Sequence, residues 1–215
     1  MSFHLFTILA FSVFMPVIIG FIKIRQILKQ RYLPVFLYVL LAFTNNLISY
    51  ILIKQGISNH VNSNVYVLFA LALLVWQFYI WNGGGVAKYR YAVILLAGIW
   101  LLENVIINRL SVNNSIFRFC FSFTILFFCV DTIHRQIFFN SQKIITNPTF
   151  LICIGLMIHY TFKAFIETFY FFSWVFETRL IIQLNFTLGF FNLVTNIFIS
   201  IAFLCMQYKP KYYQY

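Results

Sequence analysis

The sequence predicts an all-α polytopic membrane protein, a bundle of seven transmembrane helices, and three observations lead to this fold class. The first is composition: 62% of the 215 residues are hydrophobic and only 9% are charged, whereas soluble domains average roughly 25% charged residues. So few charges cannot cover a water-soluble surface, and so many apolar residues exclude a disordered chain. The other two observations are apolar segments of spanning length and an uneven distribution of basic residues.

Seven segments contain the roughly 20 mostly apolar residues that a membrane-spanning helix needs. Their length and the lack of strict alternation indicate helices rather than barrel strands. The first segment is apolar before it is basic and has no small-residue cleavage site, which favours a retained helix over a cleaved secretory signal. The predicted spans are residues 4–22, 34–53, 65–82, 91–108, 116–138, 149–173 and 180–206.

Basic residues predict the orientation of the bundle. The connections after the first, third and fifth spans, with the C-terminal tail, carry ten Lys and Arg residues, and the opposite connections carry three or four. Because basic loops stay in the cytoplasm, we expect the N-terminus outside, the C-terminus in the cytoplasm and a bacterial inner-membrane location. The net charge of +11 suits contact with anionic lipid, and without a basic folded domain we expect no nucleic-acid binding. The connections are too short for an extramembrane domain, so residues 1–215 form a single domain.

Ionisable side chains inside the predicted spans are the main candidates for function. Each costs at least ~2.5–3.5 kcal/mol at the bilayer centre, so such groups usually face the bundle interior. Glu103 lies in the fourth span, and Lys163 and Glu167 lie in the sixth, with His159 one turn earlier. The spacing 159, 163, 167 places these three side chains on one face of the helix. With a rise of about 1.5 Å per residue, Lys163 lies ~17 Å below the outer surface, near the midplane.

Asparagines in neighbouring spans lie at matching depths. Asn46 and Asn185 are placed ~8–11 Å below the outer surface, and Asn192 lies near the depth of Lys163. We therefore expect a polar pocket in the outer half of the bundle, open to the outside, that holds a ligand or an ion pair. The candidate residues are Glu103, Lys163, Glu167, His159, Asn46, Asn185 and Asn192.

Two interpretations of this polar layer remain open. In the first, Lys163 pairs with Glu103 or Glu167, the asparagines hydrogen-bond between helices, and the groups only hold the bundle together. In the second, the same groups bind a ligand or pass a proton.

No motif indicates catalysis or a cofactor. The chain has no HExxH motif of a zinc protease, and its glycine run at residues 83–85 lacks the Lys-Ser/Thr of a phosphate-binding loop. The four cysteines lie in apolar runs without a CxxC pair, which is typical of buried small side chains. We expect no catalytic residue, no cofactor and no metal, and the lack of an internal repeat counts against a transporter.

Three stretches of the chain share a wider pattern: LPVFLYVLLAFTNNLISYILIKQGISN, NPTFLICIGLMIHYTFKAFIETFYF and FNLVTNIFISIAFLCM. They resemble a group of small seven-helix inner-membrane proteins common in Bacteroidota, in which a polar pair precedes Ser-Tyr in the second span and an Asn-rich span comes last. The resemblance implies the fold and a membrane location, but no activity. The positions that carry it are Asn45, Asn46, Ser49, Tyr50, Asn192 and Asn196.

The sequence therefore predicts a non-catalytic membrane module that senses a ligand or regulates a partner by rearranging its helices. Its expected partners are the lipid bilayer and a membrane or cytoplasmic protein. Two alternatives are a small proton-coupled transporter and a structural subunit of a larger membrane complex, and an intramembrane enzyme ranks last.

Overall fold

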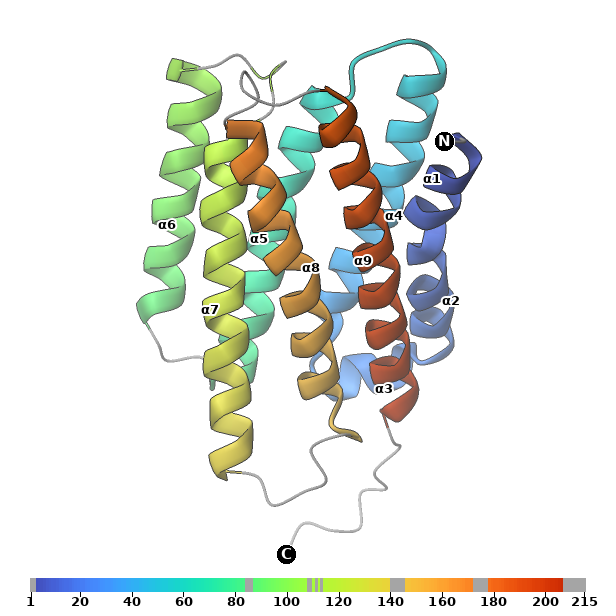
Figure 1. Cartoon of the computed structure of the whole chain (residues 1–215). Coiled ribbons are helices and arrows are strands. Elements are labelled where there is room, and N and C mark those ends of the chain that lie inside the picture. Colours follow the sequence, from blue (N-terminus) through green and yellow to red (C-terminus); the bar gives the residue numbers. More distant parts are fainter. Residues whose placement is uncertain are drawn as a thin grey trace, which may run out of the picture.

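The protein is an all-α bundle whose long helices run side by side (Figure 1). The computed structural model describes residues 3–83, 87–107, 110, 112, 114–139, 146–171 and 178–206. Within these residues a shorter apolar helix, Thr7–Ile22, precedes six helices that are long and apolar enough to cross a membrane. The six are Leu33–Lys54, His60–Trp81, Ala87–Ile107, Ser115–Gln136, Pro148–Tyr170 and Gln183–Cys205.

The helices follow one another through short connections. In chain order they are α1 (Phe3–Ala10), the 3₁₀ helix η1 (Phe11–Val13), α2 (Phe14–Ile22), α3 (Ile24–Lys29), α4 (Leu33–Lys54), α5 (His60–Trp81), α6 (Ala87–Leu101), the π-helix η2 (Leu102–Ile107), α7 (Ser115–Phe139), α8 (Pro148–Phe171) and α9 (Thr178–Cys205). The predicted spans agree with these bounds to within a few residues.

The largest difference lies at α5, which begins at His60 rather than at residue 65. The low hydropathy of this first turn excludes it from the predicted span, but its asparagine side chains form hydrogen bonds within the protein. Asn62 donates to Asn45 Oδ1 at 3.0 Å, and Asn64 donates to the carbonyl of Val112 at 2.7 Å. Because these amides are satisfied, the helix continues through a turn that the sequence suggests is loop.

Local signals set two of the helix ends. Gly56, with φ of 72°, follows α4 in the left-handed conformation that commonly ends a helix. At the start of α8, Pro148 takes the first helical position, where its missing N–H costs nothing. The Asn147 side chain accepts a hydrogen bond from the N–H of Thr149 at 2.9 Å and so caps that helix.

The first helical segment is broken near its middle. η1 separates α1 from α2, and Pro16 lies in the first turn of α2. Proline cannot donate to the preceding turn and crowds its carbonyl, which accounts for the irregular backbone there. Two side chains stabilise the break: Asn46 donates to the Ala10 carbonyl, and Asn196 donates to Ser12 Oγ, both at 2.7 Å.

α8 is the central helix of the second half of the chain, packed between α7 and α9 (Figure 1). α8 and α9 approach closely at Gly155, where an added Cβ would lie 3.0 Å from the Cβ of Phe198. Thr195 Oγ1 donates to the Gly155 carbonyl across this contact at 2.8 Å. A small residue and an interhelical hydrogen bond are the usual means of joining helices inside a bilayer.

The outer faces of the helices carry large apolar side chains. On α6 and η2, Tyr91, Ile94, Val105 and Ile106 are each at least 68% exposed. Acyl chains solvate such a surface as well as a protein core does, whereas water would not. The exposed faces therefore suit contact with a lipid bilayer.

Candidate functional site

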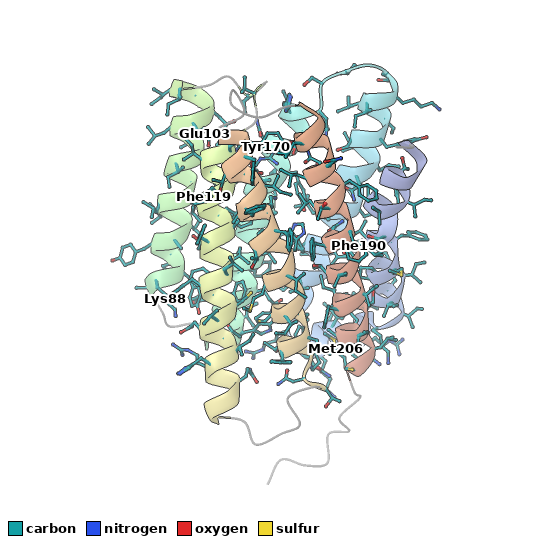
Figure 2. The ribbon with its side chains drawn as sticks, viewed as in Figure 1. Lys88, Glu103, Phe119, Tyr170, Phe190 and Met206 are labelled. Carbon is teal, nitrogen blue, oxygen red and sulfur yellow. The ribbon has the colours of Figure 1, made fainter. Side chains whose placement is uncertain are left out.

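A cavity of about 430 Å³ lies between α4, α5, α7, α8 and α9, with α1 and η1 closing one side. Its lining runs from Asn59 and His60, at the α4–α5 connection, to Tyr38 and Ile199 deeper in the bundle. Figure 2 shows Tyr170, another lining residue, among the helices near the end where α8 finishes and α9 begins. The cavity thus starts at that end of the bundle and extends past the middle of α4 and α9.

Six asparagines line the cavity, and most of them hydrogen-bond to other helices. The Asn185 amide donates to Tyr170 Oη at 2.5 Å, and the bonds of Asn46 and Asn196 stabilise the break between α1 and α2. Asn192 has no hydrogen bond to any residue that the structure describes, so its amide is left for whatever fills the cavity. The six are Asn45, Asn46, Asn59, Asn185, Asn192 and Asn196.

α8 brings His159, Lys163 and Glu167 to the cavity on one face, as their spacing predicts. Glu167 is 5% exposed. The ammonium of Lys163 lies 5.7 Å from the centre of the Tyr160 ring and forms no ion pair within the described part of the chain. His159 Nδ1 is buried and has no hydrogen-bond partner among the same residues. The predicted pairing of Lys163 with Glu103 or Glu167 is therefore not an ion pair in this structure.

Arg118 contributes a second cation to the cavity and was not among the seven candidate residues predicted from the sequence. Its guanidinium is buried, with Nε donating to Asn114 Oδ1 at 2.7 Å and Nη2 to Ser63 Oγ at 2.7 Å and Asn64 Oδ1 at 3.1 Å. A signal was present: Arg118 lies within an apolar helix, four residues after Asn114. The expectation that intramembrane charges turn inward applies to it as it does to Lys163.

Glu103, predicted to share the pocket, faces a different part of the bundle. Its carboxylate accepts hydrogen bonds from the N–H groups of Ile116 at 3.1 Å and Phe117 at 2.7 Å, in the first turn of α7. The first turn of a helix has free N–H donors and a partial positive charge, which a carboxylate neutralises. Figure 2 shows Glu103 where α6 lies beside α7. The remaining six candidate residues line the cavity together.

A second cluster of charged side chains lies at the other end of the bundle. Its charges form ion pairs, unlike Lys163 in the cavity. Lys88 Nζ is 2.7 Å from Asp131 Oδ2, and Arg135 Nε is 3.4 Å from the same oxygen. Figure 2 shows Lys88 at the lower end of α6, far along the bundle axis from Tyr170. Lys88 and Lys163 are thus two partly buried lysines, of which the first has a carboxylate partner.

The described lining of the cavity is rich in hydrogen-bonding groups. Among the residues that the structure describes, no group of three or more His, Cys, Asp or Glu side chains is placed to hold a metal ion. The cavity instead offers cationic donors, amides and hydroxyls, which bind by hydrogen bonding and charge. No protein family, curated protein or solved structure matches this chain, so the functional assignment depends on the cavity.

Proposed function

We propose that this chain is a membrane-embedded receptor module that binds a small polar solute in the cavity and acts without catalysis. The observation that carries the proposal is the cavity of about 430 Å³ with charged and amide groups on its walls. Ligand pockets have volumes of about 300–1,000 Å³ and a few convergent polar groups. Bundle stability alone does not require such a space, because a packed core excludes voids larger than a water molecule.

In the proposed topology, α1 and α2 together make a seventh crossing of a bacterial inner membrane. The described helices start at one end of the bundle with α1 and finish at the other with α9, as an odd number of crossings requires (Figure 1). Basic residues of α3 lie at the same end as Lys88, and the positive-inside rule assigns that end to the cytoplasm. The cavity then begins near the outer end, within reach of external solutes, and extends past the middle of the bundle.

Binding would couple three helices. A solute that contacts Lys163 on α8, Arg118 on α7 and Asn192 on α9 favours the helix arrangement in which all three groups reach it. A ligand shifts a conformational equilibrium by its difference in affinity for the two states. Movement of α8 between α7 and α9 would carry this shift to the basic cytoplasmic end, where a membrane or cytoplasmic partner protein would respond.

Filling the cavity tests the proposed function. The full chain in phosphatidylcholine nanodiscs is screened by thermal unfolding against amino acids, sugars, nucleosides and organic acids. We expect at least one solute to raise the melting temperature of the wild type, because binding stabilises the folded state. Asn192→Phe should remove that response, since it fills the cavity without breaking a hydrogen bond to a described residue.

Ile197→Phe is the matched control, because residue 197 is on the same helix but 41% exposed on its outer face. This variant should respond to the solute like the wild type. The proposal fails if no solute stabilises the wild type, or if both Phe variants respond equally.

A second candidate is a proton-coupled carrier, favoured by the row of titratable groups His159, Lys163 and Glu167 along α8. Such groups in series mark proton pathways in some membrane proteins. This function predicts solute uptake into proteoliposomes that follows an imposed pH gradient and disappears in Lys163→Ala. A receptor module binds the solute in the same vesicles but accumulates none.

A further inference from the structure

We propose that the cavity binds a small organic monoanion through a single carboxylate or phosphodiester group held between Lys163 and Arg118. This inference rests on the proposed binding function and names the class of solute. It is carried by the charges on the cavity wall and by the hydrogen-bonding positions that remain open there.

The wall of the cavity has an excess of positive charge. Among the described residues that line it, Lys163 and Arg118 are cations and Glu167 is the one carboxylate. Lys163 has no ion pair with any of these residues, and its ammonium lies 5.7 Å from the centre of the Tyr160 ring. A charge away from water is costly without a counter-charge, so an anion that enters the cavity removes an existing cost.

The two cations act on the same space. Lys163 on α8 and Arg118 on α7 both line the cavity. Two like charges that interact across a cavity repel each other. An anion placed between them turns this repulsion into two attractions, and charge-assisted hydrogen bonds of this kind are about twice as strong as neutral ones.

The guanidinium of Arg118 is already oriented for such a ligand. Three hydrogen bonds to Ser63, Asn64 and Asn114 hold its Nε and Nη2 atoms. Within the described part of the chain, no group accepts a hydrogen bond from Nη1. A side chain that is fixed before binding loses little entropy when the ligand arrives.

Glu167 limits the charge that the ligand can carry. Its carboxylate lines the same cavity and repels a second anionic group, so one negative charge matches the wall better than two. Asn192 supplies a free amide from α9, and Val13, Val39 and Ile199 supply apolar surface. These features fit a compact molecule with one anionic group, hydrogen-bonding groups and a short apolar part.

The experiment compares two probes that differ in charge but hardly in shape. Succinamate has one carboxylate and one amide, and succinamide is its neutral diamide. Dimethyl phosphate, a phosphodiester with one negative charge, is a further probe and is the phosphate referred to below. Thermal unfolding of the full chain is measured at pH 7 in phosphatidylcholine nanodiscs. We expect succinamate or phosphate to raise the melting temperature by about 3 °C or more at saturation, and succinamide to raise it far less.

The variants test whether Lys163 provides the charge. Lys163→Gln should weaken succinamate or phosphate binding about tenfold or more. Lys54→Gln, a matched change of an exposed lysine at the end of α4, should bind like the wild type. A further measurement in nanodiscs that contain phosphatidylglycerol tests whether the anionic group belongs to a lipid headgroup. If it does, this lipid should stabilise the wild type but not Lys163→Gln.

Three outcomes would overturn the inference. Equal shifts with succinamide and succinamate would show that charge is not recognised, and the proposed binding function would stand without it. Equal responses of Lys163→Gln and the wild type would place the anion elsewhere. No shift with succinamate, phosphate or phosphatidylglycerol would exclude an anionic ligand, and the solute screen with Asn192→Phe would then decide the proposed function separately.

Discussion

Glu103 is a buried carboxylate that caps a neighbouring helix. It is 2% exposed, and both of its oxygens accept hydrogen bonds from the first turn of α7. The π-helical turn η2 carries Glu103 and faces the start of α7. Wider helical turns of this kind often place a side chain where a regular helix would not.

Replacement of Glu103 by Ala should lower stability without removing the site. The N–H groups of Ile116, which is partly exposed, and of Phe117, which is buried, would lose their acceptor, at a cost of at most about 1–3 kcal/mol each. Thermal unfolding in nanodiscs should show a lower melting temperature for Glu103→Ala and a smaller decrease for Glu103→Gln, which keeps one acceptor oxygen. Loss of solute binding with unchanged stability would instead return Glu103 to the ligand site.

Gln77 has a comparable role at the turn between α3 and α4. Its Nε2 donates to the Arg31 carbonyl at 2.9 Å, and its Oε1 accepts from the N–H of Val35 at 3.2 Å. Arg31 has φ of 64°, a conformation that few residues other than glycine adopt readily. The side chain of Gln77 thus holds a strained turn and satisfies a free donor of α4.

Gln77→Leu should therefore destabilise the protein, because a side chain of similar size leaves both backbone groups unsatisfied. We expect a loss of about 1–3 kcal/mol, measured as a shift in the midpoint of denaturant-induced unfolding in micelles. Arg31→Gly relieves the turn and should offset part of that loss in the double variant. A Gln77→Leu protein as stable as the wild type would contradict this account of the turn.

At the scale of elements, the contact between α8 and α9 forms one wall of the cavity. Both helices contribute lining residues, and Gly155 sets how closely they approach. An added side chain at residue 155 meets the Cβ of Phe198 and the backbone of Thr195, neither of which can move without moving α9. The position of α9 relative to α8 is therefore sensitive to this one residue.

Gly155→Leu should separate the two helices and lower both the melting temperature and solute affinity. The control is Gly98→Leu on α6, where an added Cβ meets nothing within 4 Å. Because both changes place leucine in a helix, the difference between them measures the interhelical contact rather than helix propensity. Equal melting temperatures for the two variants would show that α8 and α9 do not need this approach.

The whole molecule combines an apolar outer surface with a polar cavity at one end and a paired charge cluster at the other. Large exposed side chains on α6 and η2 suit lipid, and the buried polar groups of the cavity face inward. The two ends also differ in charge pairing: Lys88 has a carboxylate partner, and Lys163 has none among the described residues. This difference between the two ends of the bundle agrees with the proposed orientation in the membrane.

Cysteine labelling in cells tests that orientation. Ser58 and Arg25 are exposed at opposite ends of the bundle, at the α4–α5 connection and in α3 respectively. In a background without the four native cysteines, a membrane-impermeant maleimide should label Ser58→Cys in intact cells and Arg25→Cys only after permeabilisation. The reverse pattern would place the cavity toward the cytoplasm, and labelling of both in intact cells would contradict a spanning bundle.

Part of the site follows directly from local sequence. His159, Lys163 and Glu167 share a face because the helical repeat is a property of neighbouring residues. The contact between Glu103 and α7 does not follow from local sequence. It depends on where α7 begins and on how α7 packs against the helix that carries Glu103. Arg118 likewise looks like an outer basic residue until α5 brings Ser63 and Asn64 to its guanidinium.

The sequence by itself determined that the chain is helical, which segments are apolar enough to cross a membrane, and which α8 residues share a face. These properties depend on composition and on a repeat of a few residues, so they can be derived along the chain. Only the tertiary structure decided which charges meet, that Glu103 caps α7, and that Arg118 joins Lys163 at a cavity. Such pairings depend on the rotation and depth of each helix against its neighbours, which packing between distant segments sets.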